Sequence, residues 1–314
     1  MRKVTAVLNP FIAGFVEGRL PDWLDVRWFG SSEELIALAP EAEIGWFDSL
    51  DLPATWQAAR LAPRLKWFNT LSAGVDPFPL DMFRERGVVL TNGAGLNAVP
   101  IAEYVVMGML VLAKGYREVV RAQERHEWLH EAPGRLELAG SRALILGAGS
   151  IGGRVGELLK PWGVEVVEAR RSPAPGVLAG DEWRARLGEF DWVIVTVPST
   201  AQTDRMIGAA ELAAMKPTAA ILNFARGAVI DQAALIAALR GRAIAAAFLD
   251  VTDPEPLPAD HPLWGLENCH ISMHLSGRSQ SKLYRRSAER FLDNLERYGR
   301  GESLAYQVDL ARGY

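Results

Sequence analysis

The stretch Leu144-Ile-Leu-Gly147-Ala-Gly149-Ser-Ile-Gly152 decides the fold. An apolar run over residues 143–146 leads into the three glycines, and a helix-like segment over residues 154–160 follows them. In such a strand–turn–helix unit the first glycine permits a tight turn, and the second lets backbone N–H groups approach a pyrophosphate. The third lets the helix pack against the strand, and the helix N-terminus favours phosphate groups. The stretch therefore predicts a dinucleotide site.

The composition bounds the class of protein. The 314 residues allow two domains, and 49% hydrophobic with 23% charged residues is typical of a globular chain. A net charge of −4 without a block of basic residues argues against a nucleic-acid partner. The single cysteine, Cys269, favours a reducing compartment, so we expect a cytoplasmic protein. The longest apolar helix candidate, residues 104–113, is too short to cross a bilayer, and no membrane partner is expected.

The glycine motif lies in the middle of the chain, so other structure is built before it. Strand-like runs at residues 4–8, 43–47, 65–70 and 88–91 alternate with helix-like pieces, which predicts a parallel α/β sheet. Five further runs follow the glycines, at residues 164–168, 192–197, 220–223, 243–249 and 269–272. With residues 143–146 they make the six strands of a doubly wound dinucleotide domain. We therefore expect an α/β fold with two parallel-sheet domains.

Two other motifs resemble a second dinucleotide site and a zinc site. Gly93-Ala-Gly95 also follows a strand-like run, but no acid or arginine cluster comes about twenty residues later, so a second dinucleotide site is not expected. His126-Glu-Trp-Leu-His130 matches the HExxH pattern of zinc proteases. Its longer metzincin form fails, because Pro133 and Leu136 stand where Gly and His are required. A solvated helix end is the preferred interpretation, and no metal is expected.

The end of the run at residues 164–168 bears on the cofactor. NAD-preferring proteins usually place an acid near this point for the ribose 2′-hydroxyl, whereas arginine suits a 2′-phosphate. Glu168 is nearby, but Arg170, Arg171 and Ser172 follow it. This order favours NADP over NAD. The alternative is that the two arginines are only solvated loop residues.

Polar residues follow three strand-like runs of the second half, where ligands of doubly wound sheets bind. They are Arg226 after residues 220–223, Glu255 after residues 243–249, and His274 after residues 269–272. Singly, each is more often structural. Together they are what a ketone reductase needs: a cation for the substrate, a proton donor, and an acid that orients the donor. Earlier in the chain, Leu71-Ser-Ala-Gly-Val-Asp76 exposes backbone N–H groups that can hold a carboxylate, or forms an ordinary turn.

Taken together, these stretches resemble the D-2-hydroxyacid dehydrogenase family. The matches follow the family's order over nearly the whole chain: Ser72–Asp76, residues 97–103, Gly147–Gly152, residues 191–203, Met215–Thr218, Asn223–Gly227, Leu249–Val251, Glu255–Pro258, His261–Trp264 and His274. The closing residues 308–314 resemble the tail of a glyoxylate/hydroxypyruvate reductase-like branch.

The resemblance implies a role for each matching residue. Arg226 would bind the substrate carboxylate and polarise its keto oxygen, His274 would be the general acid, and Glu255 its partner. Backbone N–H groups of Ala73, Gly74 and Val75 would hold the carboxylate. The implied cofactor-binding set is Gly147, Gly149, Ser150, Ile151, Gly152, Arg170, Arg171, Ser172, Val197, Pro198, Thr203, Phe224, Ala225, Asp250, Ser276 and Gly277, with Asp250 on the nicotinamide carboxamide.

The resemblance also implies the domain plan and the reaction. A Rossmann cofactor domain, residues 96–280, would be inserted into a flavodoxin-like substrate domain made of residues 1–95 and 281–314. A homodimer would form through the helix after Asn97. The expected activity is NAD(P)H-dependent reduction of a small 2-keto acid, such as glyoxylate or hydroxypyruvate, to the D-2-hydroxy acid. The alternative is a non-catalytic dinucleotide-binding regulator of the corepressor kind.

Departures from the family pattern refine these expectations. Met273 stands where many members have proline before the catalytic histidine, and Arg170 stands where many NAD-using members have an acid. Glu255 stands where formate dehydrogenases have glutamine; a carboxylate favours a charged imidazolium, which suits proton delivery to a ketone. The pocket is expected to depend on residues such as Trp46, Phe47, Leu71 and Trp264, and the sequence leaves the keto acid open.

Overall fold

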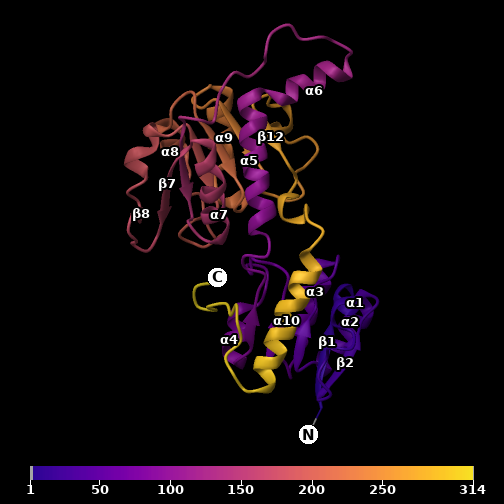
Figure 1. Cartoon of the computed structure of the whole chain (residues 1–314). Coiled ribbons are helices and arrows are strands. Elements are labelled where there is room, and N and C mark those ends of the chain that lie inside the picture. Colours follow the sequence, from indigo (N-terminus) through magenta and orange to yellow (C-terminus); the bar gives the residue numbers. More distant parts are fainter. Residues whose placement is uncertain (1–2, 314) are drawn as a thin grey trace. The chain divides into compact units, whose positions relative to one another are not determined.

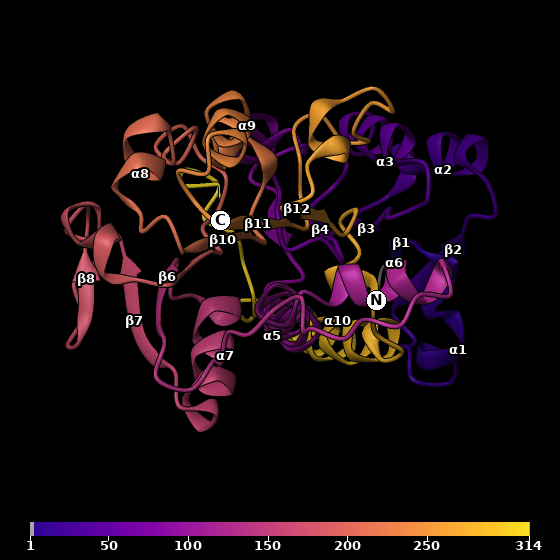
Figure 2. The same ribbon diagram turned by 90° about the horizontal axis from the view of Figure 1, so that it is seen from above.

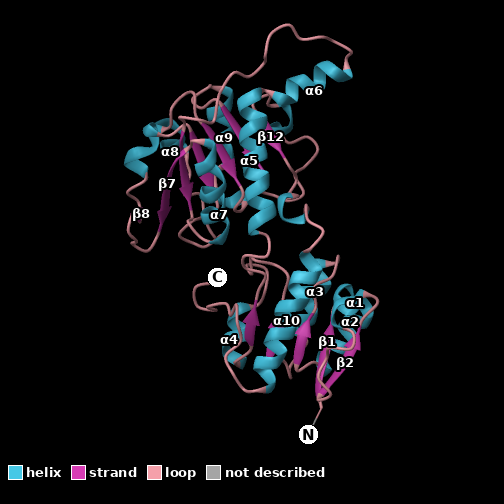
Figure 3. Ribbon diagram, viewed as in Figure 1, coloured by secondary structure: helices cyan, strands magenta, loops and turns pink. Residues whose placement is uncertain are grey.

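The computed structural model describes residues 3–313, and the chain divides into two compact units. Unit 1 comprises Met1–Asn97 with Gln280–Tyr314, and unit 2 comprises Ala98–Ser279. Each unit contains one sheet whose paired strands are all parallel (Figures 1 and 3). The predicted α/β class with two parallel-sheet domains is confirmed. Tyr314, the last residue of the family-like tail, lies outside the described residues.

The sheet of unit 1 has the strand order β2-β1-β3-β4-β5, which is the flavodoxin-like order. Its strands are β1 (Val4–Leu8), β2 (Leu24–Trp28), β3 (Ile44–Trp46), β4 (Trp67–Asn69) and β5 (Val89–Thr91). The sequence did not predict β2. This strand pairs only with β1, at the edge of the sheet, and charged residues interrupt its apolar ones, so it lacks the apolar run of a central strand.

Helices cover both faces of this sheet. They are α1 (Ala13–Val16), α2 (Ser32–Leu38), α3 (Leu52–Arg60), α4 (Leu80–Arg86) and α10 (Leu283–Gly299), with short 3-10 helices η1 (Pro10–Ile12) and η2 (Ala39–Glu41). Because successive strand residues point to opposite faces, Ala6 and Leu8 join the core with α1 and α10, whereas Val7 joins the core with α2 and α3. Figure 2 shows α2 and α3 on one side of the sheet and α1 and α10 on the other.

The sheet of unit 2 has the order β12-β11-β10-β9-β6-β7-β8. Its strands are β6 (Arg142–Leu146), β7 (Glu165–Arg170), β8 (Val177–Ala179), β9 (Trp192–Val195), β10 (Ala220–Asn223), β11 (Ala246–Leu249) and β12 (Cys269–Ile271). Six of them follow the predicted runs. The seventh, β8, was not predicted; its three residues form the outer edge and are only partly buried.

The helices of unit 2 are α5 (Ala98–Lys114), α6 (Tyr116–Glu124), α7 (Ser150–Leu159), α8 (Ala209–Ala214) and α9 (Gln232–Arg240), with 3-10 helices η3 (Lys160–Trp162), η4 (Arg184–Glu189), η5 (Gly227–Val229), η6 (Pro262–Gly265) and η7 (Ser276–Arg278). Helices α8 and α9 lie on one face of the sheet, and α5 and α7 lie on the other (Figure 2). Ile145 packs with α5 and α7, and its neighbour Leu144 packs with α8 and α9. Within the described residues no single helix is long and apolar enough to cross a membrane; α5 and α6 pass the length and composition test only as a pair bent by 71°.

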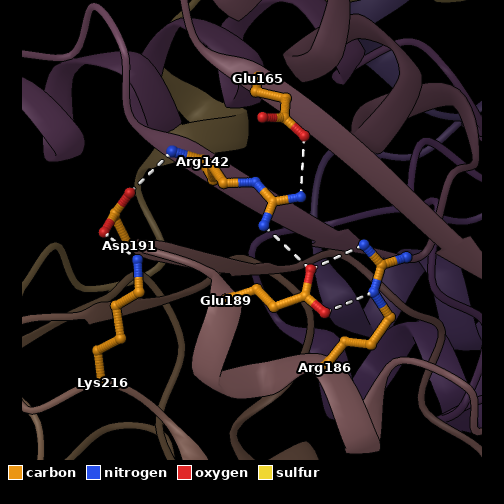
Figure 4. Close-up of polar contacts among 6 residues, drawn as sticks. All are labelled: Arg142, Glu165, Arg186, Glu189, Asp191 and Lys216. Atoms are coloured by element: carbon orange, nitrogen blue, oxygen red, sulfur yellow. Dashed lines mark hydrogen bonds and ion pairs between the residues drawn. The ribbon is translucent and has the colours of Figure 1, made fainter.

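Charged residues tie together the amino-terminal edge of this sheet (Figure 4). The network comprises Arg142, Glu165, Arg186, Glu189, Asp191 and Lys216. Arg142 opens β6 and bridges Glu165 at 2.9 Å and Glu189 at 3.0 Å. Hydrogen bonds from Arg186, and then from Arg142, lower the pKa of Glu189 to about 2. The network holds the ends of the strands opposite to those that precede the glycine loop, so we assign it a structural role.

Candidate active site

The glycine loop between β6 and α7 has the shape that its sequence predicts. Gly147 has φ +98°, and a Cβ there would lie 2.8 Å from the backbone of Thr196. A Cβ on Gly152 would lie 2.3 Å from the Gly147 carbonyl oxygen, which shows how closely α7 packs on the turn. A Cβ on Gly149 would meet nothing within 4 Å, so the backbone is open on that side. Ser150 and Ile151 form the first turn of α7, whose N-terminus is a favourable place for a pyrophosphate.

The arginines after the glycine unit lie at the carboxyl end of β7. Arg170 is its last residue, and Arg170, Arg171 and Ser172 are all exposed. The Arg170 guanidinium donates through Nε to the Ser172 carbonyl at 3.0 Å, which fixes it against the turn. Glu168 pairs with Ile145 one step inside the sheet, and its carboxylate lies against α7 at Gly156. At the strand end itself the exposed charges are therefore positive.

Other residues expected at the cofactor follow β9 and β10. Val197 and Pro198 lie in the loop after β9, separated from its end by one residue, and the Thr203 hydroxyl donates to the Pro198 carbonyl at 2.7 Å, which closes that loop. Phe224 and Ala225 follow β10 and are buried; the Phe224 ring stacks on Phe248 at 5.8 Å. Because parallel strands end at the same edge, these loops and the glycine loop share one edge of the sheet.

The turn after β10 presents Arg226. The buried Asn223 side chain accepts from the Ala225 N–H at 3.0 Å and donates to the Arg226 carbonyl at 3.0 Å, so it fixes the backbone of the turn. Arg226 Nη1 donates to the Ala225 carbonyl at 2.8 Å. The next residue, Gly227, packs so tightly that a Cβ would lie 2.0 Å from the Thr252 carbonyl carbon. The arginine turn and the loop after β11 are thus in direct contact.

Glu255 and His274 form a pair within unit 2. Glu255 Oε2 lies 2.7 Å from His274 Nδ1, and Oε1 accepts from the Thr252 N–H at 3.0 Å. Burial raises the pKa of Glu255, but the hydrogen bond and charge of His274, the Thr252 N–H and the charge of Arg226 outweigh burial and lower it. The carboxylate is therefore well suited to accept from Nδ1–H and to orient the imidazole ring. Both side chains remain partly exposed.

Asp250 fixes the loop that carries His274. Its Oδ1 accepts from the Ser272 hydroxyl at 2.7 Å and the Leu275 N–H at 3.1 Å, and its Oδ2 accepts from the Ser276 hydroxyl. Sequence reasoning missed this role of Asp250, which depends on residues more than twenty positions later. Ser276 and Gly277 begin η7.

The backbone directly before the histidine is unusual. Met273 and His274 have φ of 54° and 56°, in the left-handed region that residues other than glycine rarely adopt. Proline, which many family members carry at the position of Met273, holds φ near −65° and cannot take this conformation. A proline at position 273 would therefore not fit the backbone of this chain.

In unit 1 the predicted carboxylate loop follows β4. The Leu71 N–H donates to Asp48 Oδ2 at 2.6 Å, and the Ser72 N–H donates to the Thr70 hydroxyl at 3.1 Å. Within residues 3–313, no hydrogen bond is found from the backbone N–H groups of Ala73, Gly74 or Val75. Three consecutive N–H groups without an acceptor are suited to an anion. Sequence reasoning missed Asp48; its only signal was an acid soon after a strand.

The structure corrects the expectation for two of the pocket residues. Trp46 and Phe47 were expected to shape a pocket, but both side chains are fully buried in the two cores of unit 1. The HExxH motif begins in the turn just after α6, which ends at Glu124, and its residues are exposed, in agreement with the expected solvated helix end; His126 and His130 do not share a helical face. Among the described residues no group of three or more His, Cys, Asp or Glu side chains is placed to hold a metal ion.

Gly93 of the second glycine motif belongs to a tight turn. A Cβ there would lie 1.9 Å from the Leu71 carbonyl oxygen, so this glycine packs on the loop after β4. Of the other residues expected to shape a pocket, Leu71 is partly buried, and Trp264 is 39% exposed with its indole N–H donating to the Pro258 carbonyl at 2.9 Å.

Comparison with known proteins gives a consistent result. The family model "D-isomer specific 2-hydroxyacid dehydrogenase, NAD binding domain" matches residues 106–276. A glyoxylate/hydroxypyruvate reductase B of Pectobacterium atrosepticum is 35% identical over 235 residues, which cover 71% of this chain and 72% of that one. A D-isomer specific 2-hydroxyacid dehydrogenase family protein of Aeromonas salmonicida superposes with a TM-score of 0.85 at 28% identity, over 99% and 100% of the two chains. The Xanthobacter autotrophicus enzyme, solved in complex with NADPH and MES, gives 0.79 at 29% identity over 100% of both chains.

Proposed function

The chain belongs to the D-isomer specific 2-hydroxyacid dehydrogenase family, and we propose that it reduces a small 2-keto acid to the D-2-hydroxy acid with NADPH as the preferred cofactor. Glyoxylate and hydroxypyruvate are the first candidates for the keto acid, because relatives over most of the chain are reductases of these two compounds. The observation that carries the proposal is the Glu255–His274 pair, 2.7 Å apart, beside the Arg226 turn on a sheet with an open glycine loop.

Each of these side chains has a chemical task. His274 Nδ1 is held by Glu255, so Nε2 is the atom that gives a proton to the keto oxygen as the carbon accepts hydride. Glu255 accepts a hydrogen bond from Nδ1 and so fixes the orientation of the imidazole ring. Arg226 provides a planar pair of N–H donors that suits the substrate carboxylate. In unit 1, the N–H groups of Ala73, Gly74 and Val75 are donors of the kind that suits a carboxylate.

The residues around the glycine loop fit a dinucleotide. The open side of Gly149 and the first turn of α7 would hold the pyrophosphate, and Arg170, Arg171 and Ser172 offer cations and a hydroxyl for a 2′-phosphate. When bound, the reduced nicotinamide supplies the hydride. The preference for NADPH rests on the positive charges at the end of β7, since Glu168 is held against α7.

The test is a panel of 2-keto acids with NADPH and, separately, NADH. Glyoxylate, hydroxypyruvate and phenylpyruvate cover small, polar and bulky side chains, and the oxidation of the cofactor is followed by absorbance. We expect turnover with at least one acid and a higher kcat/KM with NADPH. If both cofactors bind but no acid turns over, the enzyme proposal fails and the dinucleotide-binding regulator replaces it. Higher efficiency with NADH would overturn the cofactor preference alone.

We also propose a cytoplasmic homodimer that binds neither nucleic acid nor membrane. Support for the dimer comes from apolar side chains exposed on α6 and the segment after it, among them Val119, Val120 and Trp128, the last 86% exposed. The cytoplasmic proposal rests on the single cysteine, Cys269, which is buried and forms no disulfide. Light scattering coupled to gel filtration measures the mass, and a mass of one chain would refute the dimer.

A further inference from the structure

Asp48 occupies an unusual place in unit 1. It follows β3, and its side chain lies beneath the loop that begins at Leu71. Three donors converge on its carboxylate: the Thr70 hydroxyl at 2.7 Å, the Trp46 indole N–H at 2.7 Å and the Leu71 N–H at 2.6 Å. The Asn9 side chain donates to the Asp48 carbonyl oxygen and so holds the backbone as well. Asp48 therefore joins the ends of β1, β3 and β4.

These contacts separate the loop into a fixed part and a free part. The Asp48 carboxylate accepts a hydrogen bond from the Leu71 N–H. The Thr70 hydroxyl donates to Asp48 and accepts from the Ser72 N–H. From the turn after β5, the Gly93 N–H donates to the Ser72 carbonyl at 2.9 Å, and Asn92 Nδ2 donates to the Ala73 carbonyl at 2.8 Å. The loop is thus held at its first N–H groups and its carbonyls. The N–H groups that follow, from Ala73 onward, are left for a ligand.

We propose that Asp48 is a positioning residue that fixes the loop 71–75 so that its free N–H groups are preorganised for the substrate carboxylate. This inference rests on the proposed function, because it assigns the ligand of that loop as the carboxylate of a 2-keto acid. Asp48 does not touch the substrate in this scheme. It acts through Leu71 and Thr70, and its loss should weaken binding of the acid more than it slows the chemical step.

The three hydrogen-bond donors explain why a carboxylate suits position 48. A carboxylate only accepts hydrogen bonds, and its two oxygens have enough lone pairs for all three donors. An amide has one acceptor oxygen, and its NH₂ group would face a donor. An apolar side chain would leave buried donors without partners. Burial raises the pKa of Asp48 while these hydrogen bonds oppose the rise, so the charged form depends on the donors that it organises.

The primary variant is Asp48→Leu, which is similar in size and has no acceptor. We expect KM for the keto acid found in the substrate panel to rise about tenfold or more, with kcat changed by less than about threefold and NADPH binding unchanged. Hydrogen–deuterium exchange of the segment 69–76, measured on the free protein, should be about tenfold faster, because the Leu71 N–H loses its acceptor and Thr70, the acceptor of the Ser72 N–H, loses the carboxylate that holds it. Asp48→Asn keeps one acceptor oxygen, so both effects should be intermediate.

Asp51→Ala is the matched control. Asp51 lies in the same segment and caps α3 by accepting from the Ala54 N–H at 3.2 Å. Its loss should lower the melting temperature without changing KM or the exchange of residues 69–76. If Asp48→Leu does not fold, Thr70→Val replaces it, because it removes the hydroxyl between Asp48 and Ser72; Thr70→Ser should then restore the wild-type KM.

The outcomes are distinct. Wild-type KM and exchange in a folded Asp48→Leu variant, or changes no larger than those of Asp51→Ala, overturn the positioning role. In the event that Asp48→Leu does not fold, unchanged KM and exchange in Thr70→Val overturn it. If the wild-type protein reduces no keto acid, the proposed function fails. The exchange experiment then still decides whether Asp48 holds the loop. The assignment of a 2-keto acid carboxylate as the ligand of the loop is refuted together with the proposed function.

Discussion

Replacement of Gly227 by alanine tests whether the Arg226 turn and the Glu255 loop act as one rigid assembly. Gly227 directly follows Arg226 and is buried against the backbone of Thr252. The Thr252 N–H in turn donates to Glu255 Oε1 at 3.0 Å. A shift at Gly227 therefore reaches both proposed catalytic side chains.

The magnitude follows from the distances. The new Cβ would lie 2.0 Å from the Thr252 carbonyl carbon and 2.1 Å from its oxygen, whereas ordinary contacts begin at 3.4 Å. One of the two backbones must therefore move by about 1.4 Å. Misplacement of a catalytic group by about 1 Å can cost about 10²-fold in rate, equivalent to about 2.7 kcal/mol. We expect Gly227→Ala to lower kcat/KM for the keto acid by about 10²-fold.

The assay separates displacement from unfolding. Overpacking also costs about 1–3 kcal/mol of stability, so kcat/KM is measured well below the melting temperature and corrected for the folded fraction. Gly265→Ala is the control, because a Cβ at Gly265 in η6 meets nothing within 4 Å. NADPH titration of both variants reports the glycine loop, which the substitution leaves intact. A kcat/KM for Gly227→Ala within about threefold of that for Gly265→Ala would refute the reasoning.

Further predictions concern single residues. His274→Ala should lower kcat by about 10²–10⁴-fold, with the Kd for NADPH from fluorescence titration unchanged; an equal loss of both would contradict the role as general acid. Replacement of Arg170 and Arg171 by alanine should raise KM for NADPH about tenfold or more and leave KM for NADH nearly unchanged, which steady-state kinetics with both cofactors would show. Met273→Gly should raise the melting temperature by relieving about 1 kcal/mol of strain at φ 54°, whereas Met273→Pro should lower it. Burial, and then two nearby arginines, lower the pKa of His270 from 6.5 to about 4. The unfolded chain therefore binds more protons between these values, so stability is full above about pH 6.5 and falls until about pH 4. Because the ring is partly exposed, we expect the free energy of unfolding to fall by only about 1–2 kcal/mol over this range. Urea titrations of the wild-type protein at several pH values should show this fall, and those of His270→Gln should not.

The sequence showed most clearly the strands whose residues are apolar on both faces, although β7, which carries two glutamates, and the edge strands β5 and β12 were predicted as well. Residues 143–146 and 220–223 are such runs, and they lie in the middle of the sheet of unit 2. The two missed strands, β2 and β8, are edge strands and need fewer apolar residues. An edge strand is defined by its hydrogen bonds to one neighbouring strand, and the local pattern of apolar residues does not show which segments pair.

The candidate site was predictable to the extent that it depends on the ends of strands. Arg226, Glu255 and His274 each follow a strand of one parallel sheet, so their gathering at one edge follows from the topology. Contacts between distant segments were not predictable. Trp46 and Phe47 are neighbours at the end of β3, and the alternation of a strand sends them into two different cores. Local sequence cannot tell which of two apolar side chains remains at a surface when both faces of the sheet are covered.

Asp48 and Asp250 show one device used in both units. Each follows a strand, and each collects a backbone N–H and a hydroxyl from a loop that carries proposed functional groups. A negative charge beneath a loop meant for anions works against binding through space, because like charges repel. The donors that surround each carboxylate neutralise much of this negative charge. A carboxylate suits the position because it accepts several hydrogen bonds and donates none. In unit 1, an anion must therefore be attracted by donors that Asp48 does not engage, and under the proposed function these are the N–H groups of Ala73, Gly74 and Val75.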